Sequence, residues 1–254
     1  MIPEFLKKYE KKLEKFKLES IRINANPLED DEVLQITESK FLGKPYLPGN
    51  FEYPKDKNGR PLILIAQINF EEVPALENYP DSGILQFYIP PTDWQYMEGY
   101  KIIYHENISE QYQTDFSFLT EDLYEESPVH CEHKLEFEKI IEYGGFTDFR
   151  FMSRLQVKGK DFADFFEEDL DESQQEEVRE IISGEGHKIG GYAYFTQEDP
   201  RWEDKKIAKH VLLLQIDTDD EIMFGDTGVG SLFIHPADLA SKKFEKAWFY
   251  WDCR

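Results

Sequence analysis

The chain has 254 residues, of which 40% are hydrophobic and 32% are charged. This length and composition are typical of a folded protein with a sizeable core, and they exclude an intrinsically disordered chain. Aspartate and glutamate outnumber lysine and arginine by 52 to 29, which gives a formal net charge of −23. Such a charge argues against a broad surface for nucleic acid or for an anionic membrane, and we expect neither as a partner.

The expected compartment follows from three further features. The N-terminal segment lacks the uninterrupted apolar stretch of a secretory signal. The longest apolar runs, residues 62–66 and 211–214, are too short to span a bilayer. Cys131 and Cys253 are too few for a disulfide framework. The sequence therefore predicts a cytoplasmic protein.

An amphipathic helix is predicted at the N-terminus, over about residues 3–19. Its apolar side chains fall on one stripe, with lysines and glutamates on the other face: Phe5, Leu6, Tyr9, Leu13 and Phe16. Pro3 suits a first helical turn. Asn26, Pro27 and the acidic run at 29–31 then indicate a loop.

Two strands are expected in each half of the chain. Residues 62–69 and 211–217 are apolar at nearly every position, so both faces of these strands should be buried. Second strands follow at 84–89 and 231–235. Because long alternation of strands with helices is absent, a doubly wound parallel fold is disfavoured.

Three elements are expected in the second part of the chain. Ser173 and Glu176 form a capping box that would open a helix, and Gly184 would end it. A short helix over 237–243 and a last strand over 247–251 follow. The predicted fold class is α+β, mostly antiparallel sheet, with an internal duplication into two related halves and a few flanking helices.

The duplication is predicted from self-similarity. Three blocks recur in the same order at offsets of 145 to 148: residues 42–48 on 189–195, 62–70 on 210–218, and 81–93 on 226–238. The second alignment places Gln67 on Gln215, and the third is identical at five of thirteen positions. We therefore expect one domain over 1–254, with repeat half one at about 40–93 and repeat half two at about 187–254.

An acidic insert is expected between the halves, over about 94–186. Residues 106–126 carry seven acids and no base, and residues 161–180 carry ten acids against Arg179 alone. The simpler interpretation is a polar loop and a solvated helical face. The alternative is a docking surface for a basic protein.

A set of motifs carries a family resemblance: residues 39–48, 59–62, 64–69, 80–88, 190–197, 213–217, 225–229 and 234–239. In this order they resemble the bacterial YwqG-like family over roughly 40–254. One departure is Leu42 before Gly43, where such sequences often carry two glycines. The family is classed as a domain of unknown function. The resemblance implies a cytoplasmic bacterial protein with an internal repeat, and it supplies no catalytic residues.

Asp81 and Asp226 are the candidate catalytic residues, because each opens an Asp-Ser/Thr-Gly triplet. One such triplet in each of two duplicated halves is the pattern of bilobal aspartic proteases, in which two close carboxylates share a proton. Here apolar residues follow each glycine directly into a strand, and no second hydroxyl supports the carboxylate. A β-turn explains the triplet, with the glycine taking positive φ. The interpretation is turn chemistry, with a hydrolase as the alternative.

Gln67 and Gln215 are the candidate binding residues. Each shares its strand with apolar neighbours, so its amide should be buried and should need hydrogen-bond partners. Either each amide bonds nearby loop backbone, or both face a small-molecule ligand at the join between the halves.

Metal and cofactor motifs are weak. The stretch from His130 to His133 matches neither a zinc-finger spacing nor a His-Glu-x-x-His helix. Residues 217–221 begin like a calcium loop, but Ile222 stands where an EF-hand needs glycine. We expect no metal and no cofactor.

The preferred hypothesis is a non-enzymatic binding or interaction protein. One alternative is an acidic inhibitor or immunity-type protein that docks a basic partner through residues 106–126 and 161–180, with salt-sensitive association. The other is a hydrolase that uses Asp81 and Asp226.

Overall fold

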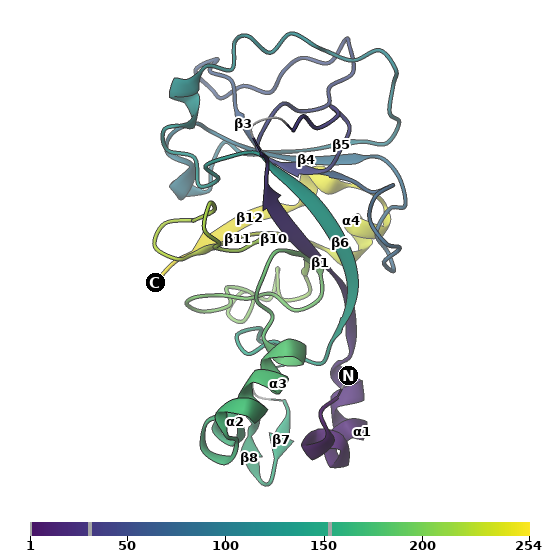
Figure 1. Cartoon of the computed structure of the whole chain (residues 1–254), viewed down its shortest axis with the longest axis vertical. Coiled ribbons are helices and arrows are strands. Elements are labelled where there is room, and N and C mark those ends of the chain that lie inside the picture. Colours follow the sequence, from purple (N-terminus) through teal and green to yellow (C-terminus); the bar gives the residue numbers. More distant parts are fainter. Residues whose placement is uncertain (1, 30–31, 152–153) are drawn as a thin grey trace.

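One curled antiparallel sheet organises the chain (Figure 1). The computed structural model describes residues 2–29, 32–151 and 154–254. The strands of this sheet are β1 (Leu18–Pro27), β2 (Lys40–Phe41), β3 (Ile63–Asn69), β4 (Ile84–Ile89), β5 (Lys101–His105), β6 (His133–Glu142), β9 (Lys188–Gly190), β10 (Val211–Ile216), β11 (Val229–Ile234) and β12 (Trp248–Asp252). A separate two-stranded ribbon joins β7 (Gln156–Val157) to β8 (Lys160–Asp161).

The strand order is β12-β11-β10-β9-β1-β6-β2-β3-β4-β5. The two long central strands pair over their whole length, from Leu18 opposite Glu142 to Pro27 opposite His133. From β6 the sheet continues through β2 to β5, and from β1 it continues through β9 to β12 in the corresponding order. The strands that follow β1 along the chain are therefore attached to β6, and the strands that follow β6 are attached to β1.

The two outer parts of the sheet pack against each other. Phe87 on β4 contacts Phe249 on β12 with ring centroids 5.0 Å apart, and Tyr104 on β5 contacts Phe244 at 4.8 Å. Every residue of β3, β4 and β11 is buried. The expectation that residues 62–69 and 211–217 bury both faces is confirmed, since β10 is also buried from Leu212 to Ile216. The α+β fold with a mostly antiparallel sheet is confirmed as well.

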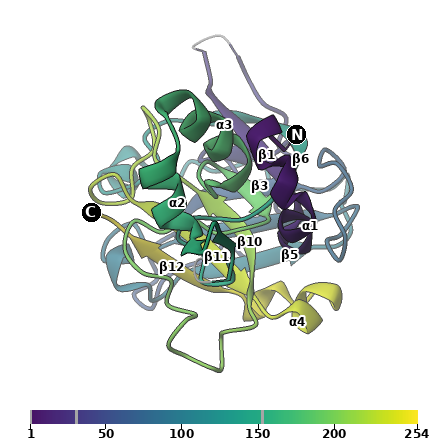
Figure 2. The same cartoon turned by 90° about the horizontal axis from the view of Figure 1, so that it is seen from below.

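The N-terminal helical segment and the two helices within residues 162–182 lie together at one end of the molecule, away from α4 (Pro236–Ala240) (Figures 1 and 2). The N-terminal segment forms η1 (Glu4–Tyr9), α1 (Glu10–Leu13) and η2 (Glu14–Phe16), and it packs with α2 (Phe162–Asp169) and α3 (Glu172–Ile182). The remaining helical turns are η3 (Trp94–Tyr96), η4 (Glu121–Tyr124), α4 (Pro236–Ala240) and η5 (Phe244–Lys246). None of the described helices has the length and apolar character that a membrane crossing requires.

Four segments differ from the sequence-based expectation. Asn26 and Pro27, expected in a loop, are the last residues of β1, where they pair with Lys134 and His133 of β6. The N-terminal helical segment ends at Phe16, and Leu18 and Glu19 already belong to β1, whose position is set by pairing with β6. The range 94–186 holds β5 and the central strand β6, so it is part of the sheet. The capping box of α3 is formed by Asp171 and Gln174, two residues earlier than the expected pair of Ser173 and Glu176.

Candidate functional site

Gln67 lies on β3 and is fully buried. Its Oε1 accepts hydrogen bonds from the backbone N–H of Tyr46 and from Nε2 of Gln86, both at 2.8 Å. Its Nε2 donates to the carbonyl oxygens of Ile36 and Glu38, again at 2.8 Å. The amide is thus fully used by its own half of the protein, mainly to hold loop backbone.

Gln215 on β10 is also fully buried and has the corresponding partners. Its Oε1 accepts from the N–H of Tyr194 at 2.8 Å, and its Nε2 donates to the carbonyl oxygens of Gly184 and Gly186 at 3.0 and 2.8 Å. Each backbone partner lies 148 residues after its counterpart around Gln67. A ligand could reach either amide only if these loops moved.

Asp81 and Asp226 lie in the turns that lead into β4 and β11, and both are exposed. Gly83 takes a φ of +85°, as a turn glycine does. In the second triplet Thr227 takes the positive φ, while Gly228 is required by space, because a Cβ there would lie 2.1 Å from a backbone oxygen. No hydrogen bond joins the two carboxylates in the described chain.

A small cluster surrounds Cys131 near the start of β6. His133 Nδ1 lies 2.8 Å from the carbonyl oxygen of Cys131, so that nitrogen carries the proton, because a carbonyl only accepts. Burial lowers the pKa of His133, and burial together with the charges of Glu221 and Asp219 raises the pKa of the Cys131 thiol. Among the residues with described positions, no group of three or more His, Cys, Asp or Glu side chains is placed to hold a metal ion.

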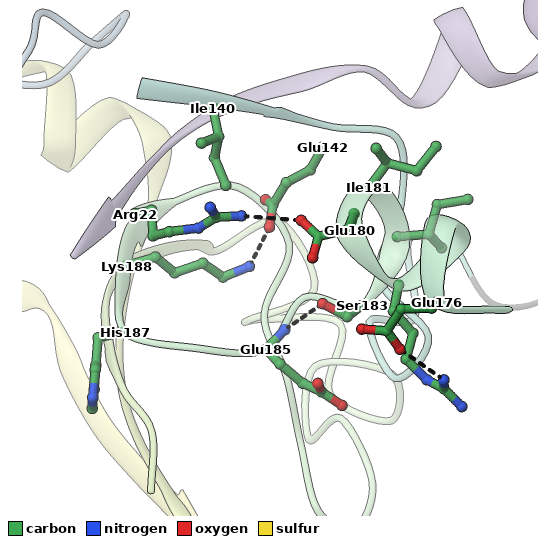
Figure 3. Close-up of a pocket in the computed structure, with 12 residues that line it drawn as sticks. Arg22, Ile140, Glu142, Glu176, Glu180, Ile181, Ser183, Glu185, His187 and Lys188 are labelled. Atoms are coloured by element: carbon green, nitrogen blue, oxygen red, sulfur yellow. Dashed lines mark hydrogen bonds and ion pairs between the residues drawn. The ribbon is translucent and has the colours of Figure 1, made fainter. Parts of the chain in front are cut away.

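A different set of residues forms a cavity of about 180 Å³ between α3 and the central strands, which we call the polar pocket (Figure 3). Its floor carries Arg22 from β1 and Lys188 from β9, which stand directly opposite each other in the strand register. Like charges in such a cross-strand pair repel each other. Nearby anionic groups must therefore offset the repulsion between these two side chains.

Glu142 supplies the first counter-charge. Lys188 Nζ donates to Glu142 Oε1 at 2.5 Å, and Glu142 Oε2 accepts from the N–H of Tyr192 at 2.9 Å. Both charged side chains are buried, with 2% of the Lys188 side chain and 7% of the Glu142 side chain exposed. An ammonium has three N–H bonds. Only one of those on Lys188 has a hydrogen-bond partner in the described part of the chain.

Arg22 is held less tightly. Its guanidinium lies 3.6 Å from Glu138 and 3.9 Å from Glu180 of α3, distances of ion pairs rather than hydrogen bonds. Figure 3 shows Arg22 and Lys188 extending side by side toward Glu142 and Glu180. The floor of the pocket thus offers several N–H donors that the described protein groups do not use.

The opposite wall of the pocket is acidic. It combines Glu176, Arg179 and Glu180 of α3 with Glu185 from the loop that follows, and Arg179 pairs with Glu176 at 3.4 Å, so that Glu180 and Glu185 supply the excess negative charge. Burial and the nearby charge of Asp217 raise the pKa of Glu185. The C-terminal end of a helix also carries partial negative charge. Cationic donors on the floor therefore face a wall that favours positive charge.

The sequence contained one signal for this pocket. Lys40 and Lys188 start short strands at an offset of 148, and an apolar residue, Phe41 or Ile189, follows each of them directly. Lys40 is also buried, 3.6 Å from Glu132. A buried lysine at the same place in both halves needs a carboxylate partner. The identity of that partner, Glu142, depends on the fold.

The fold and this site define an α+β protein with one curled antiparallel sheet and a charged pocket beside its central strands. Residues 39–253 match the family model described as "Domain of unknown function (DUF1963)", and the chain belongs to this family. The match covers every strand of the main sheet except β1. A comparison with curated proteins found no match.

Proposed function

We propose that the chain is a cytoplasmic bacterial protein of the YwqG-like type that acts by binding rather than by catalysis. Its ligand in this proposal is a small zwitterion of the α-amino-acid class, held in the polar pocket. The observation that carries the proposal is the directly opposed pair Arg22 and Lys188, with unused N–H donors, facing an acidic wall.

A zwitterion suits the pocket better than a simple anion. The ligand carboxylate accepts hydrogen bonds from Lys188 and Arg22, and its ammonium lies against Glu185 and the C-terminal end of α3. A net-neutral ligand also avoids repulsion by the carboxylates that line the pocket itself. The cavity, about 180 Å³, is smaller than pockets for drug-sized ligands, which favours a small molecule.

The lining also favours binding over catalysis. His187 lines the pocket, but its Nδ1 accepts from the N–H of Asp217 at 3.0 Å and its Nε2 donates to Asp219 at 3.1 Å. The hydroxyl of Ser183 accepts from the N–H of Glu185 at 3.2 Å. The imidazole therefore has no nitrogen free to act as a base for that hydroxyl.

Calorimetric titration of the full chain with the twenty α-amino acids tests this proposal. We expect at least one to bind saturably, and its decarboxylated amine and its N-acetyl derivative to bind at least tenfold more weakly. Arg22→Gln should weaken binding by at least tenfold, because the carboxylate loses a charged donor. Lys134→Gln is the matched control, since Lys134 opposes Lys40 as Arg22 opposes Lys188.

Two outcomes contradict the proposal. If no amino acid binds, or if the amine and the N-acetyl derivative bind as tightly as the parent, the ligand is not a zwitterion held at both charges. If Arg22→Gln and Lys134→Gln leave the same affinity, the ligand lies elsewhere. Arg22 is half-exposed, so the variant should fold normally.

The inhibitor alternative has less support. Residues 106–126 pack through Phe116 and Leu119 against the part of the core beneath β3 and β4. Residues 161–180 form α2 and α3 at the helical end of the molecule (Figure 1). The two acidic stretches thus form separate surfaces, so one basic partner would engage only one of them. For the hydrolase, the exposed positions of Asp81 and Asp226 add no support.

We also propose that the two groups of strands descend from one duplicated segment. The hydrogen bonds of Gln67 and Gln215 support this, because their backbone partners share one offset of 148. A second pair agrees with it. Tyr53 donates to the carbonyl oxygen of Leu62, and Arg201, 148 residues later, donates to that of His210.

A further inference from the structure

A second cavity, of about 390 Å³, lies where the two parts of the sheet meet, and we call it the junction cavity. The loop at 76–79 forms one side, while β1, β9, β10 and α4 contribute the other. Most of its wall is apolar: Leu18, Leu76, Tyr79, Val211, Leu212, Pro236 and Leu239. Its volume lies within the range of small-molecule sites.

One guanidinium, that of Arg150, lines this apolar cavity. Its Nε and Nη2 donate to the two carboxylate oxygens of Asp148 at 2.9 and 2.7 Å, and Nη2 also donates to the carbonyl oxygen of Gly191 at 2.8 Å. The guanidinium also lies 4.9 Å from the ring centre of Tyr192. These contacts fix its orientation. They leave Nη1 as its one nitrogen without a hydrogen-bond partner among the described residues.

We infer that the junction cavity binds an amphipathic monocarboxylate, with the carboxylate on Arg150 Nη1 and the apolar body against the leucine-rich wall. A fixed guanidinium suits a carboxylate, because little side-chain freedom is lost on binding. The apolar wall selects against fully polar anions, whose remaining oxygens would lose their water there.

The charges around the cavity favour a ligand that carries a single negative charge. Asp148 already offsets much of the charge of Arg150, and Glu19 and Glu77 lie at the cavity together with Lys17. A dianion such as a phosphate monoester would therefore stay partly uncompensated. The net charge of the whole protein acts more weakly at this site, because physiological salt screens exposed charges beyond about 8 Å.

Calorimetric titration of the full chain with octanoate, octanol and octylamine tests this inference. We expect saturable binding of one octanoate, with octanol and octylamine at least tenfold weaker. Arg150→Met should reduce octanoate affinity at least tenfold, and it leaves Asp148 paired with Arg201 at 2.9 Å. Val211→Trp should reduce it similarly by filling the cavity. Arg22→Gln should leave it unchanged, so this result is independent of the polar pocket.

Three results overturn the inference: no saturable octanoate binding, equal binding of octanol or octylamine, or unchanged octanoate affinity in Val211→Trp. Arg150→Met decides the role of the guanidinium if thermal unfolding shows that the variant is folded. If that variant does not fold, Val211→Trp and the comparison of the three head groups still decide the proposal.

Discussion

Replacing Asp148 by asparagine should lower the free energy of unfolding by about 3–5 kcal/mol, because it leaves buried cationic charge uncompensated. Asp148 is fully buried, and its Oδ2 accepts hydrogen bonds from Arg150, from Arg201 and from the N–H of Ala193. Arg201 is itself fully buried and would keep only Asp199 as an anionic partner. Asparagine preserves the shape of the side chain, so the loss reports on charge.

Urea unfolding of the wild type and the variant measures this loss. The matched control is Asp169→Asn, which removes a carboxylate paired with Lys158 and Lys160 at the surface. Surface ion pairs contribute little, so the control should change stability far less than Asp148→Asn. Equal losses in the two variants would contradict the assignment of Asp148 as the centre of a buried ionic network.

The difference in the free energy of unfolding between the wild type and Asp148→Asn should depend on pH. Burial alone would raise the pKa of Asp148, but the charges of Arg150 and Arg201 hold it well below its ordinary value. A carboxylate with a depressed folded pKa contributes stability above its unfolded pKa of about 3.9, and that stability is lost as pH falls through the folded pKa. The wild type should therefore exceed Asp148→Asn by a constant margin from pH 5 to 7. Below about pH 4 the margin should shrink.

The outer strands of the fold could be predicted from sequence, and the central ones could not. The strands β3, β4, β10 and β11 are apolar almost throughout because the curled sheet buries both of their faces. By contrast, β1 and β6 expose many polar side chains, and β6 alternates Lys134, Glu136 and Glu138 with less polar residues. Because of these charged residues, neither segment has the apolar pattern that predicts a buried strand. The position of both strands is set only by their pairing with each other.

Some residues of the candidate sites could likewise be predicted from the sequence, and others could not. The two buried glutamines could be found because the internal alignment superimposes them. The pair Lys188 and Glu142 could not, because its members lie 46 residues apart and meet only when β9 and β6 flank β1. Arg150 has a local partner in Asp148, but the cavity beside it is assembled from segments of both halves. Spacing along the chain carries no information about such contacts.

Gln67→Leu should lower the free energy of unfolding by at least about 3 kcal/mol. Leucine nearly conserves the volume, but it leaves the N–H of Tyr46 and the carbonyl oxygens of Ile36 and Glu38 without their partner. Each buried group left unpaired costs about 1–3 kcal/mol. Urea unfolding measures the loss. Gln156→Leu, at an exposed position of β7, is the control and should stay within about 0.5 kcal/mol of the wild type.

Gln215→Leu should destabilise the protein in the same way but less severely. The partner of Gln67 across the strand pair is Gln86, which also bonds its amide, whereas the residue opposite Gln215 is Ser231. The Ser231 hydroxyl is buried and has no hydrogen-bond partner among the residues that the structure describes, so it loses none when Gln215 is replaced. Losses in this order, with faster hydrogen exchange at Tyr46 and Tyr194 respectively, would show that each glutamine holds the loops of its own half. If either variant keeps the full stability of the wild type, the replaced glutamine does not hold these loops. Its amide would then again be a candidate for ligand binding.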